Sequence, residues 1–185
     1  MVFTLLLRSL AEAIVPTAEA HCDTADGPAV IDGRRALEVG NINHALKWIQ
    51  ADADAELTEV FDKALAVRKL GAGAAEVADR LFLETLVRLH RMGEGVGFTG
   101  ILPSGTEIDP IVVAADRATE IGDDREVLAL VPAERREELH RRFEIMLGKK
   151  GFDVDDVGAG RDYVAAYVSF YKYAEGEDHA HDHHH

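Results

Sequence analysis

Residues 28–40, PAVIDGRRALEVG, recur in residues 110–122, PIVVAADRATEIG, and this recurrence decides the fold. Both stretches start with a proline and stop at a glycine, the residues that favour the first turn and the C-terminal end of a helix. Between these ends the apolar residues follow helical spacing. We therefore expect each stretch to form one helix, and the chain to contain the same helix twice.

The agreement extends outward from these helices at a shift of 82 residues, without a gap. It includes three further apolar pairs: Leu46 with Leu128, Phe61 with Phe143, and Leu65 with Leu147. Shared apolar positions are what two copies of one helical unit need in order to pack together. We predict an all-α helical bundle of two tandem repeats, about 21–102 and about 103–176, related by a pseudo-twofold axis.

Glycine, proline and Asp or Asn residues divide the chain into helical segments, and no sustained alternation of apolar and polar residues indicates a strand. The expected helices cover residues 28–39, 41–49, 54–70, 74–92, 110–121, 123–131, 132–149 and 155–175. The glycine-rich connection 93–105 is long, and such loops in compact domains usually carry function or move. We expect residues 21–176 to form one domain.

Length and charge exclude several classes of function. The chain has 185 residues, of which 47% are hydrophobic, enough for one substantial core. Its 34 acidic and 20 basic residues give a net charge of −14, which opposes binding to nucleic acids and to acidic membranes. An acidic surface attracts cations. No stretch is long enough to span a membrane, and homo-oligomerisation is left open.

The two ends of the chain carry separate signals. Residues 1–20 predict an amphipathic helix or a degenerate signal segment, and Ala18-Glu19-Ala20 has the form of a signal-peptidase site. Cys22 is the single cysteine, so no intramolecular disulfide can form and a cytoplasmic location is the simpler interpretation. Export after cleavage behind Ala20 is the alternative. The histidine-rich tail 177–185 would bind nickel or zinc whatever the fold does, and we expect it to be disordered.

Residues that break the repeat are the best candidates for a site, because duplication supplies the scaffold. The run His21-Cys22-Asp23 matches the nearly inert Pro103-Ser104-Gly105. Imidazole, thiolate and carboxylate suit nickel, copper, iron or zinc. We expect a metal site at this run, completed by further side chains: Glu84, His90 and Glu94. The alternatives are a buried apolar Cys22 and an Asp23 that caps a turn.

Three arginines near helix ends, Arg68, Arg88 and Arg91, predict a site for a small anionic substrate, although solvated charged faces explain them equally well. Cys22, His90 and Glu94 are the expected catalytic side chains. The leading hypothesis is a transition-metal-binding protein that acts as a redox enzyme. The alternatives are a metal-free enzyme using the Cys22 thiolate, and a non-catalytic metal carrier or partner-binding module.

The run His21-Cys22-Asp23-Thr24-x-Asp26-Gly27-Pro28 resembles a motif of an uncharacterised family of small prokaryotic proteins. Later stretches that look like the same family are Leu65–Gly71, Glu84–Gly95 and Thr99-Gly100. The resemblance covers nearly the whole chain after residue 20. It implies that these segments form one unit shared with that family. It implies no activity, because the family's function is unassigned.

The start His21-Cys22-Asp23 also resembles the mature N-terminus of the nickel superoxide dismutases, which are helical bundles. That resemblance implies a nickel site at the free amine, imidazole and thiolate. This chain has Asp26 where that family has a second cysteine, and the free amine requires cleavage after Ala20. Both departures weaken the case for superoxide chemistry.

Overall fold

A computed structural model describes residues 21–176, and the predicted segments 1–20 and 177–185 lie outside the described residues. The described part is all-α, as predicted, and contains no strand beyond an isolated bridge between Thr24 and Leu102. Its α-helices are α2 (Pro28–Val39), α3 (Asn43–Leu46), α4 (Asp54–Arg68), α5 (Ala72–Gly93), α6 (Pro110–Ile121), α7 (Arg125–Leu130), α8 (Arg136–Lys149) and α9 (Val157–Glu175). Two 3₁₀ turns, Ala51–Ala53 and Ala133–Arg135, precede α4 and α8.

The two stretches that match in sequence form the matching helices α2 and α6. Each has its proline in the first turn. Each ends at a left-handed glycine, Gly40 with φ 70° and Gly122 with φ 73°, whose N–H bonds a carbonyl of the last turn. A side chain at either glycine would be strained, because L residues with a Cβ rarely adopt this conformation. These ends turn the chain into α3 and α7.

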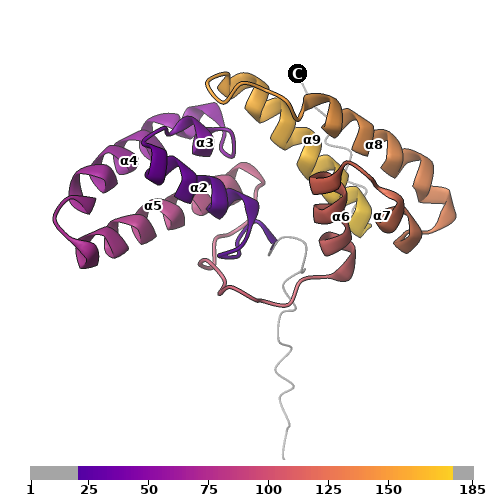
Figure 1. The fold of residues 1–185 in the computed structure, drawn as a ribbon, viewed down its shortest axis with the longest axis horizontal. Coiled ribbons are helices and arrows are strands. Elements are labelled where there is room, and N and C mark those ends of the chain that lie inside the picture. The colour runs from indigo at the N-terminus through magenta and orange to yellow at the C-terminus, as the bar shows by residue number, and fades with distance from the viewer. Residues whose placement is uncertain (1–20, 177–185) are drawn as a thin grey trace, which may run out of the picture.

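The order of elements also recurs. Helical elements start at residues 28, 51 and 54, and the corresponding elements start at residues 110, 133 and 136. The offset between each pair is 82 residues. Figure 1 shows α2–α5 as one wing and α6–α9 as the other, with the connection 94–109 running between them. The helix starts therefore keep the sequence offset, whereas the tandem repeats and their pseudo-twofold axis stay predictions.

Buried apolar side chains of both wings belong to one core. Within the first wing Phe61 of α4 packs on Phe82 of α5, with ring centroids 5.3 Å apart. In the second wing Phe143 of α8 packs on Phe170 of α9 at 5.4 Å. Trp48 crosses from the first wing to α9, where its ring meets the Tyr167 ring edge-on at 5.9 Å.

Polar contacts complete the junction between the wings. The Arg161 guanidinium of α9 donates to the Ile49 carbonyl at 2.9 Å and pairs with Asp54. Asp155 accepts from the side-chain amides of Asn41 and Asn43, each at 3.0 Å. These bonds hold the start of α9 against the first wing. None of the helices described is long and apolar enough to cross a membrane.

Candidate functional site

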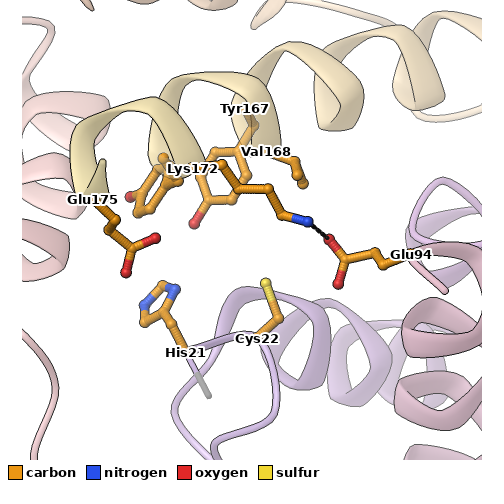
Figure 2. A pocket seen from close by; sticks show the side chains of 8 residues that line it. His21, Cys22, Glu94, Tyr167, Val168, Lys172 and Glu175 are labelled. Carbon is orange, nitrogen blue, oxygen red and sulfur yellow. Dashed lines mark ion pairs between the residues drawn. The ribbon is translucent and has the colours of Figure 1, made fainter. Parts of the chain in front are cut away.

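A small pocket lies at the junction of the two wings (Figure 2). One wall is the segment His21-Cys22 together with Glu94 at the end of α5. The opposite wall is α9, which contributes Tyr167, Val168, Tyr171, Lys172 and Glu175. The volume of about 30 Å³ is room for a water molecule or two, or for a small ion.

The backbone of residues 21–27 folds back on itself beneath this pocket. The Thr24 hydroxyl donates to the His21 carbonyl at 3.1 Å, and Leu102 exchanges backbone hydrogen bonds with Asp23 and Ala25. A Cβ on Gly27 would lie 2.2 Å from the His21 carbonyl oxygen. Only glycine fits at this close approach, so Gly27 shapes the pocket wall through backbone geometry.

His21 is buried and its ring is held from the second wing. Its Nε2 lies 2.7 Å from Oδ2 of Asp116 on α6. The other oxygen of that carboxylate, Oδ1, accepts a hydrogen bond from the Tyr171 hydroxyl. The rings of His21 and Tyr171 also stack, with centroids 5.8 Å apart and planes 11° apart. One carboxylate thus joins an imidazole and a phenol across the junction.

Asp23 is directed away from the pocket and toward Arg91. Its Oδ2 lies 3.3 Å from Nε of Arg91, and the two side chains are only 6% and 5% exposed. Charges removed from water need a partner nearby. Asp23 therefore serves a buried ion pair that fastens the segment 21–27 to α5.

Cys22 carries a thiol in an environment that favours its protonated form. Shielding from water raises the pKa of the Cys22 thiol most, and the nearby carboxylates of Glu94, Asp23 and Asp116 raise it further. The described residues offer this thiol no hydrogen bond from an imidazole. Nucleophilic catalysis needs the opposite, a thiolate stabilised by nearby positive charge or by a base.

Glu94 stands where three cationic or imidazole groups approach one carboxylate. Its Oε1 lies 3.3 Å from Nζ of Lys172, an ion pair that crosses the pocket from α9 (Figure 2). Its Oε2 lies 3.8 Å from Arg91 and 3.8 Å from Nε2 of His90. The side chain is 17% exposed, so little water reaches it.

His90 lies behind Glu94, with 4% of its surface exposed. Its Nδ1 is 2.8 Å from the Trp48 carbonyl oxygen, and because a carbonyl can only accept, Nδ1 carries the proton. Nε2 is buried and has no hydrogen-bond partner among residues 21–176. Burial is the main cause that lowers the pKa of His90, which keeps the ring neutral and leaves the Nε2 lone pair available.

The remaining predicted site residues lie elsewhere. Glu84 pairs with Arg80 at 2.8 Å, Arg68 with Asp79 at 3.1 Å, and Arg88 with Glu56. None of Glu84, Arg68 or Arg88 lines the pocket, and each has its ion-pair partner outside it. The predicted anion site of three arginines is therefore not assembled, and the basic side chain in the pocket is Lys172.

The predicted metal ligands do not form a ready ligand cluster either. Between residues 21 and 176, no three histidine, cysteine, aspartate or glutamate side chains are grouped so that they could hold a metal ion. Two of the predicted ligands already have other partners. Asp23 forms an ion pair with Arg91, and the His21 imidazole contacts the Asp116 carboxylate. Of the predicted ligands, Cys22 and Glu94 share the pocket with His21, and His90 stands directly behind Glu94.

Several residues of this site were not among the sequence-predicted candidates, among them the α9 residues of the pocket and the charged partners Asp116 and Lys172. Asp116 matches Arg34 under the 82-residue shift, and Lys172 matches Arg91 after the single deletion. The Arg34-to-Asp116 change reverses the charge within otherwise matching helices, a break in the repeat that could have revealed Asp116. Arg91 and Lys172 are both basic, so the comparison of repeats held no signal for Lys172.

These features define an all-α protein of two helical wings whose junction contains a small pocket bordered by a thiol and by ionisable side chains. By sequence the chain matches the family of unknown function DUF6448 over residues 26–173, and it belongs to this family. That range includes the helices and Asp116 but begins after His21-Cys22-Asp23. No curated protein and no solved structure matches the chain significantly.

Proposed function

We propose that the chain binds one transition-metal ion through the thiolate of Cys22, the carboxylate of Glu94 and Nε2 of His90, three side chains that must move closer together to surround the ion. The observation that carries this proposal is the pair His90 and Glu94. A buried imidazole lone pair faces a carboxylate oxygen at 3.8 Å, and Nε2 has no donor to satisfy it. Two electron-rich atoms in this position favour a cation between them.

The distance between His90 and Glu94 fits an ion of ordinary ligand geometry. Imidazole nitrogen and carboxylate oxygen bind zinc at roughly 2.0–2.2 Å, so one ion can bridge a gap of 3.8 Å. The Nδ1–H bond to the Trp48 carbonyl fixes the ring and its tautomer, as the outer partners of metal-binding histidines do. Cys22 lines the same pocket as Glu94 and adds a soft sulfur ligand.

Three protein ligands would leave a position open toward the pocket, which is typical of catalytic rather than structural metal sites. Thiolate with imidazole and carboxylate suits nickel, copper, iron or zinc, so the proposal includes a redox role without choosing the metal. The thiol-enzyme alternative is weaker, because the surroundings of Cys22 disfavour the free thiolate. The pocket has room for an ion but not for a substrate-sized ligand, so it does not argue against a partner-binding module.

Replacing Cys22 with serine tests the proposal. Titration with Co²⁺ gives a sulfur-to-metal absorption band only when a thiolate binds the ion. We use the full chain with the tail histidines 179, 181, 183, 184 and 185 changed to asparagine, because the tail binds metals by itself. We expect one Co²⁺ per chain with this band, and a loss of the band with about a hundredfold weaker binding in Cys22→Ser.

The matched control is His44→Gln, which changes another histidine of the first wing that does not line the pocket. It should bind Co²⁺ like the parent. Glu94→Gln and His90→Gln should each weaken binding while keeping the sulfur band. Equal Co²⁺ affinity and stoichiometry in the parent and Cys22→Ser would remove Cys22 from the site and overturn the proposal.

Replacing Lys172 is expected to strengthen metal binding, whereas replacing any of the proposed ligands is expected to weaken it. Its ammonium group sits 3.3 Å from the Glu94 carboxylate that the metal would use, so it competes with the metal for this ligand. Lys172→Met should therefore bind Co²⁺ more tightly, by about tenfold, the equivalent of roughly 1.4 kcal/mol. Isothermal titration of Lys172→Met beside Lys149→Met, which pairs on the surface with Asp162, checks it. Unchanged affinity would show that the ion does not use Glu94.

A further inference from the structure

We infer that Tyr171 is a redox-active tyrosine, which gives up one electron to an oxidant at the pocket while its phenolic proton passes to Asp116. This activity lies beyond metal binding, and the test below needs no bound metal. The inference rests on the hydrogen bonds of Tyr171, on its burial beside the pocket and on the chain of aromatic rings behind it.

The hydrogen bonds provide a fixed proton acceptor. The Tyr171 hydroxyl donates to Oδ1 of Asp116, and the Tyr167 hydroxyl approaches the same oxygen at 3.5 Å. Oδ2 of Asp116 is 2.7 Å from Nε2 of His21, which prevents the carboxylate from turning away. A positioned base within hydrogen-bond reach is the requirement for proton transfer in a chemical step.

The surroundings of Tyr171 favour coupled loss of the electron and the proton. Tyr171 is 6% exposed and borders the pocket, so little water surrounds its phenol. Burial, followed by the charge of Asp116, raises the pKa of Tyr171, so the phenolate does not form beforehand. An isolated buried charge is costly, and transfer of the proton to Asp116 leaves a neutral radical.

Aromatic rings form a continuous path from Tyr171 into the first wing. The Tyr171 and Tyr167 centroids are 4.2 Å apart, Tyr167 and Trp48 are 5.9 Å apart, and Trp48 and His90 are 5.7 Å apart. Electrons transfer rapidly between oxidisable rings in such proximity. The path ends at His90 and links the redox tyrosine to the inner wall of the pocket.

The Tyr171 O–H bond breaks, one electron passes to a one-electron oxidant such as an oxidised transition-metal complex, and the proton forms a bond to Oδ1 of Asp116. The products are a neutral tyrosyl radical, a protonated carboxyl group and the oxidant reduced by one electron. A one-electron reductant and return of the proton restore Tyr171.

Photochemical oxidation of the full, metal-free chain tests the inference. A light flash on tris(bipyridine)ruthenium with persulfate produces a ruthenium(III) oxidant, and electron paramagnetic resonance detects the radical. All 4 tyrosines lie on α9, which limits the assignment to a few variants. We expect a neutral tyrosyl radical in the parent that is absent in Tyr171→Phe.

Tyr173→Phe is the matched control, because Arg135 and Arg142 both lie over the Tyr173 ring at 4.4 Å and disfavour its oxidation. It should keep the signal. Asp116→Asn removes the base and should slow radical formation by about a hundredfold, and Asp116→Glu should restore much of the rate. A signal that persists in Tyr171→Phe overturns the inference, as does an unchanged rate in a folded Asp116→Asn. Tyr171→Phe keeps the test decisive if Asp116→Asn does not fold.

Discussion

Replacing Arg91 with methionine is expected to lower the free energy of unfolding by about 3–5 kcal/mol. Arg91 and Asp23 form an ion pair with side chains 5% and 6% exposed, so removal of the guanidinium leaves a buried carboxylate without its partner. Methionine has a long, unbranched side chain like that of arginine, so the decrease in the free energy of unfolding arises from the missing charge rather than from a cavity. Urea unfolding followed by circular dichroism measures it.

Arg88→Met is the matched control, since Arg88 lies on the same helix and pairs with a half-exposed Glu56. Exposed pairs contribute about 0–1 kcal/mol, so this variant should be nearly as stable as the parent. Adding Asp23→Asn to Arg91→Met should recover part of the lost stability. Equal stability of Arg91→Met and Arg88→Met would mean that the Asp23–Arg91 pair does not fasten the pocket wall.

Truncating Phe143 to alanine is also expected to cost about 3–5 kcal/mol, because it removes a fully buried aromatic ring. Phe143 is 2% exposed and packs on Phe170. Phe61, its counterpart in the repeat, is 4% exposed and packs on Phe82 in the same way. Phe61→Ala should therefore cost a similar amount, which makes the two variants a matched pair.

The same pair of variants tests whether the wings unfold as one unit. The single tryptophan, Trp48, belongs to the first wing and contacts Tyr167 of the second. We expect its fluorescence and the far-ultraviolet circular dichroism to change at the same urea concentration in both variants. A Phe143→Ala chain whose circular dichroism falls well before its Trp48 fluorescence changes would mean that the second wing unfolds independently.

The sequence identified which residues to consider more successfully than it identified their partners. The break in the repeat at His21-Cys22 led to the wall of the pocket, and Glu94 belongs to the same wall. His90, another predicted ligand, is buried behind Glu94. The prediction also placed three further residues in the site: Glu84, Arg68 and Arg88. Each of them forms an ion pair outside the pocket.

Helix positions could be predicted because their causes are local. Proline in a first turn, glycine after a last turn and apolar residues at helical spacing act within one or two turns of the chain. The same signals occur 82 residues apart, so the repeated order of helices also followed from the residues alone. The structure confirms the all-α class on these grounds.

The partners across the pocket depended on how the wings pack. His21 meets Asp116, 95 positions away, and Glu94 meets Lys172, 78 positions away. The reversed charge at Asp116 marks a break in the repeat, but no local signal pairs it with His21 or pairs Lys172 with Glu94, because these contacts arise only when α6 and α9 pack against the first wing. Local chain chemistry therefore determined the helices, and long-range packing determined which charged groups meet in the pocket.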